Sequence, residues 1–155
     1  MALAFRAIPM DAEPAAALVD ALRAELRALS DDLDVDAPHM PAAGPREFDP
    51  PRGTFLVGFD ATGAPVCCGG VKPLGGGACE LKRMYVVPER RGAGAGRELL
   101  AALEDAARSL GHAVARLDTG PRQPRAERMW RRAGYRPIGN FNDNPMASFW
   151  GEKPL

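Results

Sequence analysis

Apolar residues recur along the chain with two different periods, and the alternation of these periods predicts the order of the secondary structure. Helical spacing predicts three helices, at about residues 11–29, 97–110 and 125–133. Short β-prone runs bounded by turn residues predict seven strands, at residues 3–8, 54–59, 66–74, 78–87, 113–118, 135–138 and 148–153. This order predicts a mixed α/β (α+β) fold with an antiparallel N-terminal meander and a crossover helix in the middle. With 155 residues, we expect a single domain spanning residues 1–155.

Four local features refine this outline. The segment 30–53 is acidic, proline-rich and without clear periodicity, which is typical of a functional lid or of a plain surface loop. Asp11 is expected to cap the first helix. His112 begins a strand and is expected to be exposed. Cys67 and Cys68 are neighbours on a strand, so we expect one to point inward and the other outward.

The composition is that of a water-soluble globular chain, with 46% hydrophobic and 26% charged residues. No apolar run approaches the roughly 20 residues of a membrane span, and the N-terminus lacks a signal-peptide hydrophobic region. These observations favour a cytoplasmic protein that does not bind membranes. The three cysteines form no C-x-x-C pair, so we expect neither a disulfide framework nor a metal site.

Charge is unevenly distributed although the net charge is zero. Residues 1–60 contain 5 arginines and 11 acids, a net charge of −6, and residues 61–155 carry the compensating +6. A basic second half suits a ligand with several phosphates, and an acidic first half could attract a cationic amine. No basic run is interleaved with aromatic residues, so we expect no nucleic-acid partner.

A glycine-rich turn lies between a β-prone run and an amphipathic helix, at residues 90–97 (Arg-Arg-Gly-Ala-Gly-Ala-Gly-Arg). A strand, a glycine turn and a helix start form an anion site, because unpaired amides point out of the first helical turn. The P-loop pattern is excluded because no Lys-Ser or Lys-Thr follows the glycines. The dinucleotide pattern G-x-G-x-x-G fails because its third position is Arg97 or Leu99. Arg91-x-x-Gly94-x-Gly96 remains.

Three segments together resemble the GNAT superfamily of acyl-CoA N-acyltransferases: residues 80–86 (Glu-Leu-Lys-Arg-Met-Tyr-Val), residues 94–100 (Gly-Ala-Gly-Arg-Glu-Leu-Leu) and residues 126–135 (Ala-Glu-Arg-Met-Trp-Arg-Arg-Ala-Gly-Tyr). Arg91-x-x-Gly94-x-Gly96 is similar to the R/Q-x-x-G-x-G/A loop of that family. The order of elements is similar to that family from about residue 3 to the C-terminus. The resemblance implies a central, mostly antiparallel sheet of about seven strands with a splayed parallel pair. Helices would flank both faces of this sheet.

The resemblance also implies acetyl-CoA as co-substrate and no metal. In that family the loop amides hold the pyrophosphate of coenzyme A, and the strand before the loop holds the pantetheine arm. The loop positions are Arg91, Gly92, Ala93, Gly94, Ala95, Gly96 and Arg97. The strand positions are Met84, Tyr85 and Val86. Gln123 stands where the family often has an asparagine that binds pantetheine.

Acyl transfer to an amine requires a polarised carbonyl, a neutral amine and a stabilised leaving thiolate. Glu80 is the first candidate general base and Asp118 the second, because family members carry base carboxylates at similar positions; the alternatives are a surface ion pair for Glu80 and a turn cap for Asp118. Trp130 occupies the position of the family's acid tyrosine, and an indole donates no proton at neutral pH. Tyr85 and Tyr135 are the remaining hydroxyl candidates.

We therefore expect a cytoplasmic N-acetyltransferase that moves an acetyl group from acetyl-CoA to a primary amine of a small molecule or amino acid by direct attack. Two alternatives stay open: a non-catalytic acyl-CoA-binding regulatory module, and a protein or peptide N-terminal acetyltransferase. A monomer and a homodimer are both compatible with the sequence, which does not identify the acceptor.

Overall fold

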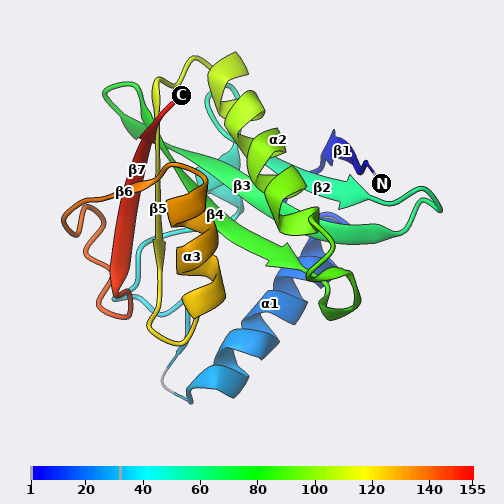
Figure 1. Ribbon diagram of the computed structural model, residues 1–155, viewed down its shortest axis with the longest axis horizontal. Coiled ribbons are helices and arrows are strands. Elements are labelled where there is room, and N and C mark those ends of the chain that lie inside the picture. The colour runs from blue at the N-terminus through cyan, green and yellow to red at the C-terminus, as the bar shows by residue number, and fades with distance from the viewer. Residues whose placement is uncertain (1, 32) are drawn as a thin grey trace.

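The computed structural model describes residues 2–31 and 33–155. The strands of this part of the chain form one seven-stranded sheet (Figure 1) in the order β1-β2-β3-β4-β5-β7-β6. Their bounds are β1 Ala4–Ala7, β2 Thr54–Phe59, β3 Pro65–Gly75, β4 Ala78–Val86, β5 Val114–Thr119, β6 Arg136–Pro137 and β7 Phe149–Pro154. The helices are α1 Ala15–Leu29, α2 Ala95–Ser109 and α3 Pro124–Arg132, with 3-10 turns at Pro45–Phe48 and Pro88–Arg90.

All neighbouring strands pair antiparallel except β4 and β5, which are parallel. The parallel pairing covers only Ala78–Glu80 of β4, opposite residues 114–116 of β5. Beyond Glu80 the two strands separate, and β4 continues to Val86 without β5 at its side. The predicted fold class, with its splayed parallel pair, is therefore confirmed.

A β-bulge lies in β4 next to the point of separation. Lys82 pairs with Gly70 of β3, and Tyr85 pairs with Cys68, so two residues of β4 face one residue of β3. Within the bulge, Arg83 has a φ of 56°, a left-handed conformation that is uncommon for a residue with a Cβ atom. The bulge turns the arginine side chain away from the regular alternation of the strand.

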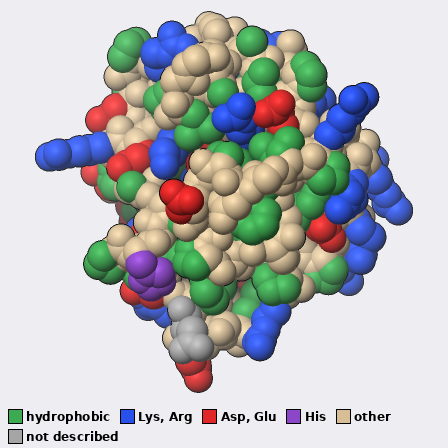
Figure 2. All heavy atoms as spheres, turned by 90° about the vertical axis from the view of Figure 1, so that its left-hand side faces the viewer, with side chains coloured by type: hydrophobic (Ala, Val, Ile, Leu, Met, Phe, Trp, Pro, Cys, Tyr) green, Lys and Arg blue, Asp and Glu red, His purple; other side chains and the backbone are tan. Residues whose placement is uncertain are grey.

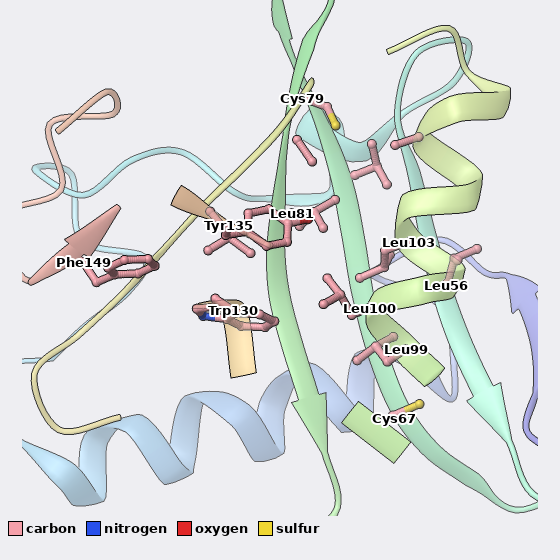
Figure 3. Close-up of a cluster of buried hydrophobic side chains, with 14 of the residues drawn as sticks. Leu56, Cys67, Cys79, Leu81, Leu99, Leu100, Leu103, Trp130, Tyr135 and Phe149 are labelled. Atoms are coloured by element: carbon pink, nitrogen blue, oxygen red, sulfur yellow. The ribbon is translucent and has the colours of Figure 1, made fainter. Parts of the chain in front are cut away.

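Helices cover both faces of the sheet. The apolar face of α2 packs with residues of α3 and β7 on one side, where Figure 3 shows Leu99, Leu100 and Leu103 beside Leu81, with Trp130 across β4. The helix α1 and part of the segment 30–53 cover the other side. Their buried side chains include Leu18, Val19, Leu22, Leu26, Ala43 and Phe48. The helical spacing of apolar residues in α1 thus has the predicted role.

Two local predictions are wrong, and a third is correct only in part. Asp11 does not cap α1, which begins after Pro14 without a side-chain cap. His112 is 4% exposed, because its Nε2 donates to the carbonyl oxygen of Arg52 at 2.8 Å. Cys67 and Cys68 do point to opposite faces, but neither is exposed, because helices cover both sides of the sheet.

None of the helices in the described ranges is long and apolar enough to cross a membrane.

Candidate active site

The separation of β4 and β5 opens a cleft that passes between the two covered faces of the sheet. Its floor comes from the two strands: Leu81, Lys82, Arg83, Met84, Leu117, Asp118 and Thr119. One wall comes from α1 and the segment 30–53: Leu22, Leu26, Leu33, Val35, Met40 and Pro41. The other wall comes from α3 and the loops next to it: Gly120, Gln123, Ala126, Trp130, Asn144 and Met146. The cleft therefore connects the α3 side of the sheet with the α1 side.

Two carboxylates meet at the point where the strands separate. Glu80 is the last paired residue of β4 and has no exposed surface, whereas the Asp118 side chain is 11% exposed and lines the cleft. Lys82 Nζ lies 3.0 Å from Glu80 Oε2 and 3.6 Å from Asp118 Oδ1. The three side chains carry a net charge of −1 when all are ionised. Glu80 is thus not the surface glutamate of the alternative interpretation, although it does pair with Lys82.

Asn142 bridges the same two carboxylates from the loop between β6 and β7. Its Nδ2 donates to Glu80 Oε2 at 2.9 Å and to Asp118 Oδ2 at 2.7 Å. Its Oδ1 accepts from Trp150 Nε1 at 3.1 Å, which orients the amide with its donor toward the carboxylates. Asn144 Nδ2 also donates to Asp118 Oδ2, at 2.8 Å. Asp118 is therefore held by two amides and a lysine, and it does not cap the following turn.

The loop presents these amides because asparagine occurs at every second position from 140 to 144. Each Asn side-chain oxygen accepts from the backbone amide two residues later, at Asn142, Asn144 and Met146. Side-chain bonds of this kind replace regular secondary structure and curl the chain. The predicted site did not include these asparagines, and the Asn-x-Asn-x-Asn spacing is the signal that could have indicated them.

Glu80 Oε1 is buried and has no hydrogen-bond partner among the described residues. A buried carboxylate oxygen without a partner is costly in a folded protein. Next to the cleft there is therefore one carboxylate oxygen that could still accept a hydrogen bond.

The glycine loop leads directly into the first turn of α2, which begins at Ala95, two residues before its predicted start. The backbone amides from Gly92 to Arg97 donate to no acceptor in residues 2–31 or 33–155. Gly94 has a φ of 95°, which favours glycine. Gly96 lies against α3, where an added Cβ would be 3.2 Å from Met129 Sδ. The loop thus presents a row of donors beside α3, in the arrangement that binds anions.

Arginines add positive charge to this side of the molecule. Figure 2 shows basic side chains projecting along its right-hand edge, the side on which α3 lies. The exposed arginines on and next to α3 are Arg122, Arg125, Arg128, Arg131, Arg132 and Arg136. Together with the loop amides they make this side of the molecule favourable for a ligand with several phosphates.

The other predicted residues are distributed unequally. Met84 and Gln123 line the cleft, and Gln123 Oε1 accepts from Thr119 Oγ1 at 3.1 Å. Tyr85 lies in the hydrophobic cluster on the α1 side and is not among the cleft residues. Burial raises the pKa of Tyr85. Arg91 turns back toward the sheet and α1, where its Nε donates to the carbonyl oxygen of Val86 at 2.8 Å.

Trp130 forms part of the cleft wall on α3. It is 6% exposed, its ring packs edge-on against Tyr135, and its Nε1 has no partner among the described residues. Tyr135 is committed elsewhere, since its hydroxyl donates to Glu104 Oε1 at 2.9 Å. Burial, followed by the neighbouring Glu104, raises the pKa of Tyr135. Neither predicted tyrosine therefore lines the cleft.

Arg83 ties the segment 30–53 to the sheet. Its guanidinium donates to the carbonyl oxygens of Ala43 and Val35 and to Asp36 Oδ1, the last at 3.0 Å. Burial lowers the pKa of Arg83, although the Asp36 carboxylate opposes this effect. The segment thus forms a wall of the cleft that the β4 bulge holds in place.

Comparison with known proteins identifies the class to which this fold and cleft belong. Residues 15–135 match the acetyltransferase (GNAT) family, so the chain belongs to this family. An uncharacterised N-acetyltransferase of Schizosaccharomyces pombe is 35% identical over 104 residues, which cover 66% of this chain and 64% of that protein. An IAA acetyltransferase of Azospirillum brasilense is 38% identical over 105 residues, which cover 65% of this chain and 67% of that protein.

The similarity of the fold extends over the whole chain. The crystal structure of a proposed acyl-CoA N-acyltransferase from Klebsiella pneumoniae has a TM-score of 0.78 and 29% identity. The matched region covers 99% of this chain and 97% of that chain. The predicted family is therefore confirmed.

Proposed function

We propose that this protein is an N-acetyltransferase that moves an acetyl group from acetyl-CoA to a primary amine. The observation that carries the proposal is the cleft between β4 and β5, which has a carboxylate cluster on its floor and anion-binding amides near its α3 side. Membership of the family supports an acyl-CoA co-substrate. The acetyl group, the amine and the residue roles below are proposed.

Coenzyme A would bind on the α3 side of the cleft. The amides of Gly92 to Arg97 fit a pyrophosphate, because they are unpaired and lie at the positive end of the α2 dipole. The pantetheine arm would pass Met84 and Gln123, and the thioester would lie near the point where β4 and β5 separate. Beyond Glu80, β4 stays paired with β3, but the edge that faces β5 has no strand partner, and its backbone groups would be available to that arm.

The acceptor would enter from the α1 side and meet Asp118. The amine nitrogen attacks the thioester carbonyl, a C–N bond forms, the C–S bond breaks, and the thiolate of coenzyme A leaves. Asp118 accepts the proton of the amine, directly or through one water, because it is the carboxylate that lines the cleft. Glu80 and Asn142 act through Asp118 by fixing its position and charge.

A second candidate function is a non-catalytic acyl-CoA-binding module. It is favoured by Trp130, which fills the cleft wall with a ring that cannot protonate a leaving thiolate. The thiolate of coenzyme A can leave without an acid, so this observation does not remove the enzymatic proposal.

Release of free coenzyme A tests the proposal. Thiol appearance from acetyl-CoA, followed with a thiol reagent, should depend on added amine and saturate with it. Asp118→Asn should lower kcat/KM by about 100-fold, the range of a lost general base. Glu80→Gln should lower kcat/KM less than Asp118→Asn, because Glu80 acts through Asp118 and does not itself accept the proton.

The matched control is Glu152→Gln, because Glu152 is a half-buried sheet carboxylate that pairs with Arg116 on β5 outside the cleft. It should keep the wild-type rate. Binding of acetyl-CoA without amine-dependent thiol release, across small amines and peptides, would refute the enzymatic proposal and favour the binding module.

A further inference from the structure

We infer that the acceptor is a primary amine with an apolar body and no carboxylate. The inference rests on the proposed function, because it assigns the α1 side of the cleft to the acceptor. It narrows the acceptor class, since amino acids become poor substrates.

The first observation is the chemistry of the cleft wall on the α1 side. Among the described residues, those that line this wall are all apolar: Leu22, Leu26, Leu33, Val35, Met40 and Pro41. Met146 adds a further apolar side chain from the β6–β7 loop. An acceptor whose amine reaches Asp118 therefore places the rest of its body against hydrocarbon. Burying an apolar body there is favourable, whereas burying an unpaired charge is not.

The second observation is that both cations of the cleft are already engaged. Lys82 lies between the carboxylates of Glu80 and Asp118. The Arg83 guanidinium is bound by two backbone carbonyl oxygens and by Asp36. A substrate carboxylate would therefore enter the cleft without an available cationic partner among the lining residues.

The third observation is the sign of the remaining charge. The cluster of Glu80, Lys82 and Asp118 has a net charge of −1, which attracts one ammonium group and repels a carboxylate. The charge of Arg83, the other cation on the floor, is balanced by its ion pair with Asp36 and does not offset that of the cluster. Attraction of an ammonium and repulsion of a carboxylate therefore act in the same direction along the acceptor's path.

Two matched pairs of amines test the inference. In the first pair, 2-phenylethylamine and phenylalanine differ by a carboxylate beside the amine. In the second, hexylamine and 6-aminohexanoate differ by a carboxylate at the far end. The value of kcat/KM, measured from thiol release, should be at least about tenfold higher for 2-phenylethylamine and hexylamine than for their carboxylate-bearing counterparts. This is the expected effect of burying a charged group without a partner.

A charge introduced into the wall supplies the second test. Met40→Lys places an ammonium on a half-buried lining residue, with a side chain of similar length. The ratio of kcat/KM for hexylamine to kcat/KM for 6-aminohexanoate should fall by about fivefold, because the new ammonium can form an ion pair with the carboxylate. His39→Lys is the matched control, because it adds the same charge on the neighbouring residue, which is exposed and does not line the cleft. The control should keep the wild-type ratio.

Binding of the four amines, measured by calorimetry with and without coenzyme A, separates the inference from the proposed function. Turnover that favours either carboxylate-bearing amine would overturn the acceptor class and leave acetyl transfer intact. Absence of thiol release with every amine would overturn the proposed function. In that case, the binding order of each pair decides the inference: tighter binding of 2-phenylethylamine and hexylamine supports it, and equal or reversed binding overturns it.

Discussion

Asn142 offers the sharpest test of the site, because one side chain connects both carboxylates. We expect Asn142→Ala to remove hydrogen bonds to Glu80 and Asp118, and to leave Trp150 Nε1 without its acceptor. Hydrogen bonds to charged groups contribute about 1.5–3 kcal/mol each. Since water can enter the vacated space, we expect the free energy of unfolding to fall by about 3 kcal/mol, near the lower limit of that sum.

For a domain of this size, about 3 kcal/mol corresponds to a decrease in Tm of roughly 6–12 °C. Thermal or urea unfolding followed by circular dichroism measures the change. Asn140→Ala is the matched control, because Asn140 is exposed and accepts one longer bond, from the Asn142 amide at 3.3 Å. We expect it to stay within about 0.5 kcal/mol of the wild type.

Activity should follow the same order as stability. Asp118 would lose one of its two amide donors, and we expect kcat/KM for the best amine to fall by at least about tenfold, because small misplacements of reacting groups are costly. Asn142→Asp should be at least as damaging as Asn142→Ala, because it places a third acceptor between two carboxylates. If either Asn142 variant has the same stability and the same kcat/KM as the Asn140→Ala control, the Asn142 bridge contributes to neither stability nor activity, and the reasoning is refuted.

Three further predictions concern the loop, a turn and the thiols. Gly94→Ala should raise the KM for acetyl-CoA, while Gly63→Ala, which has a similar positive φ (83° against 95°) in a distant turn, should cost similar stability without changing KM. A bond from Thr62 holds the pKa of Asp60 below its ordinary value, so Asp60→Asn should lower Tm at pH 7, and the difference should shrink below about pH 4, where the unfolded-state carboxyl is protonated. Burial raises the pKa of Cys67 to about 11 and those of the other two thiols to about 12, so Ellman's reagent at pH 8 should find no reactive thiol until the protein unfolds.

The sequence predicted most of the fold because its signals are local. Apolar residues at helical spacing mark α1 and α2, and their observed ends, at Leu29 and Ser109, lie within a residue of prediction. The separation of β4 from β5 came from the family resemblance, since no local pattern states where two strands stop pairing. The starts of the helices were predicted less accurately than their ends. The helix α1 begins without the expected cap, and α2 begins inside the glycine loop.

The parts of the candidate site that could be predicted are those formed by residues close together in the sequence. Glu80 and Asp118 were proposed as candidates from the family resemblance, but their shared partner Asn142 is 62 residues from Glu80 in the sequence. His112 shows the same limit, because its burial depends on the carbonyl of Arg52, 60 residues away. Contacts of this kind depend on how loops meet, and a hydrophobic period carries no information about them.

The same contrast, between contacts local in sequence and contacts between distant loops, separates the two halves of the proposed reaction. The cofactor half would depend on a strand, a glycine turn and a helix start that are contiguous in sequence, so a short pattern is enough to predict it. The acceptor half depends on the segment 30–53, which Arg83 ties to β4, and on the β6–β7 loop, which Asn142 ties to Asp118 of β5. Because those contacts also set the charge and the apolar wall of the cleft, exchanging the wall should change which amine is acetylated while leaving acetyl-CoA binding unaltered. Equal KM values for acetyl-CoA in wild type and Met40→Lys, alongside altered amine preference, would demonstrate that separation.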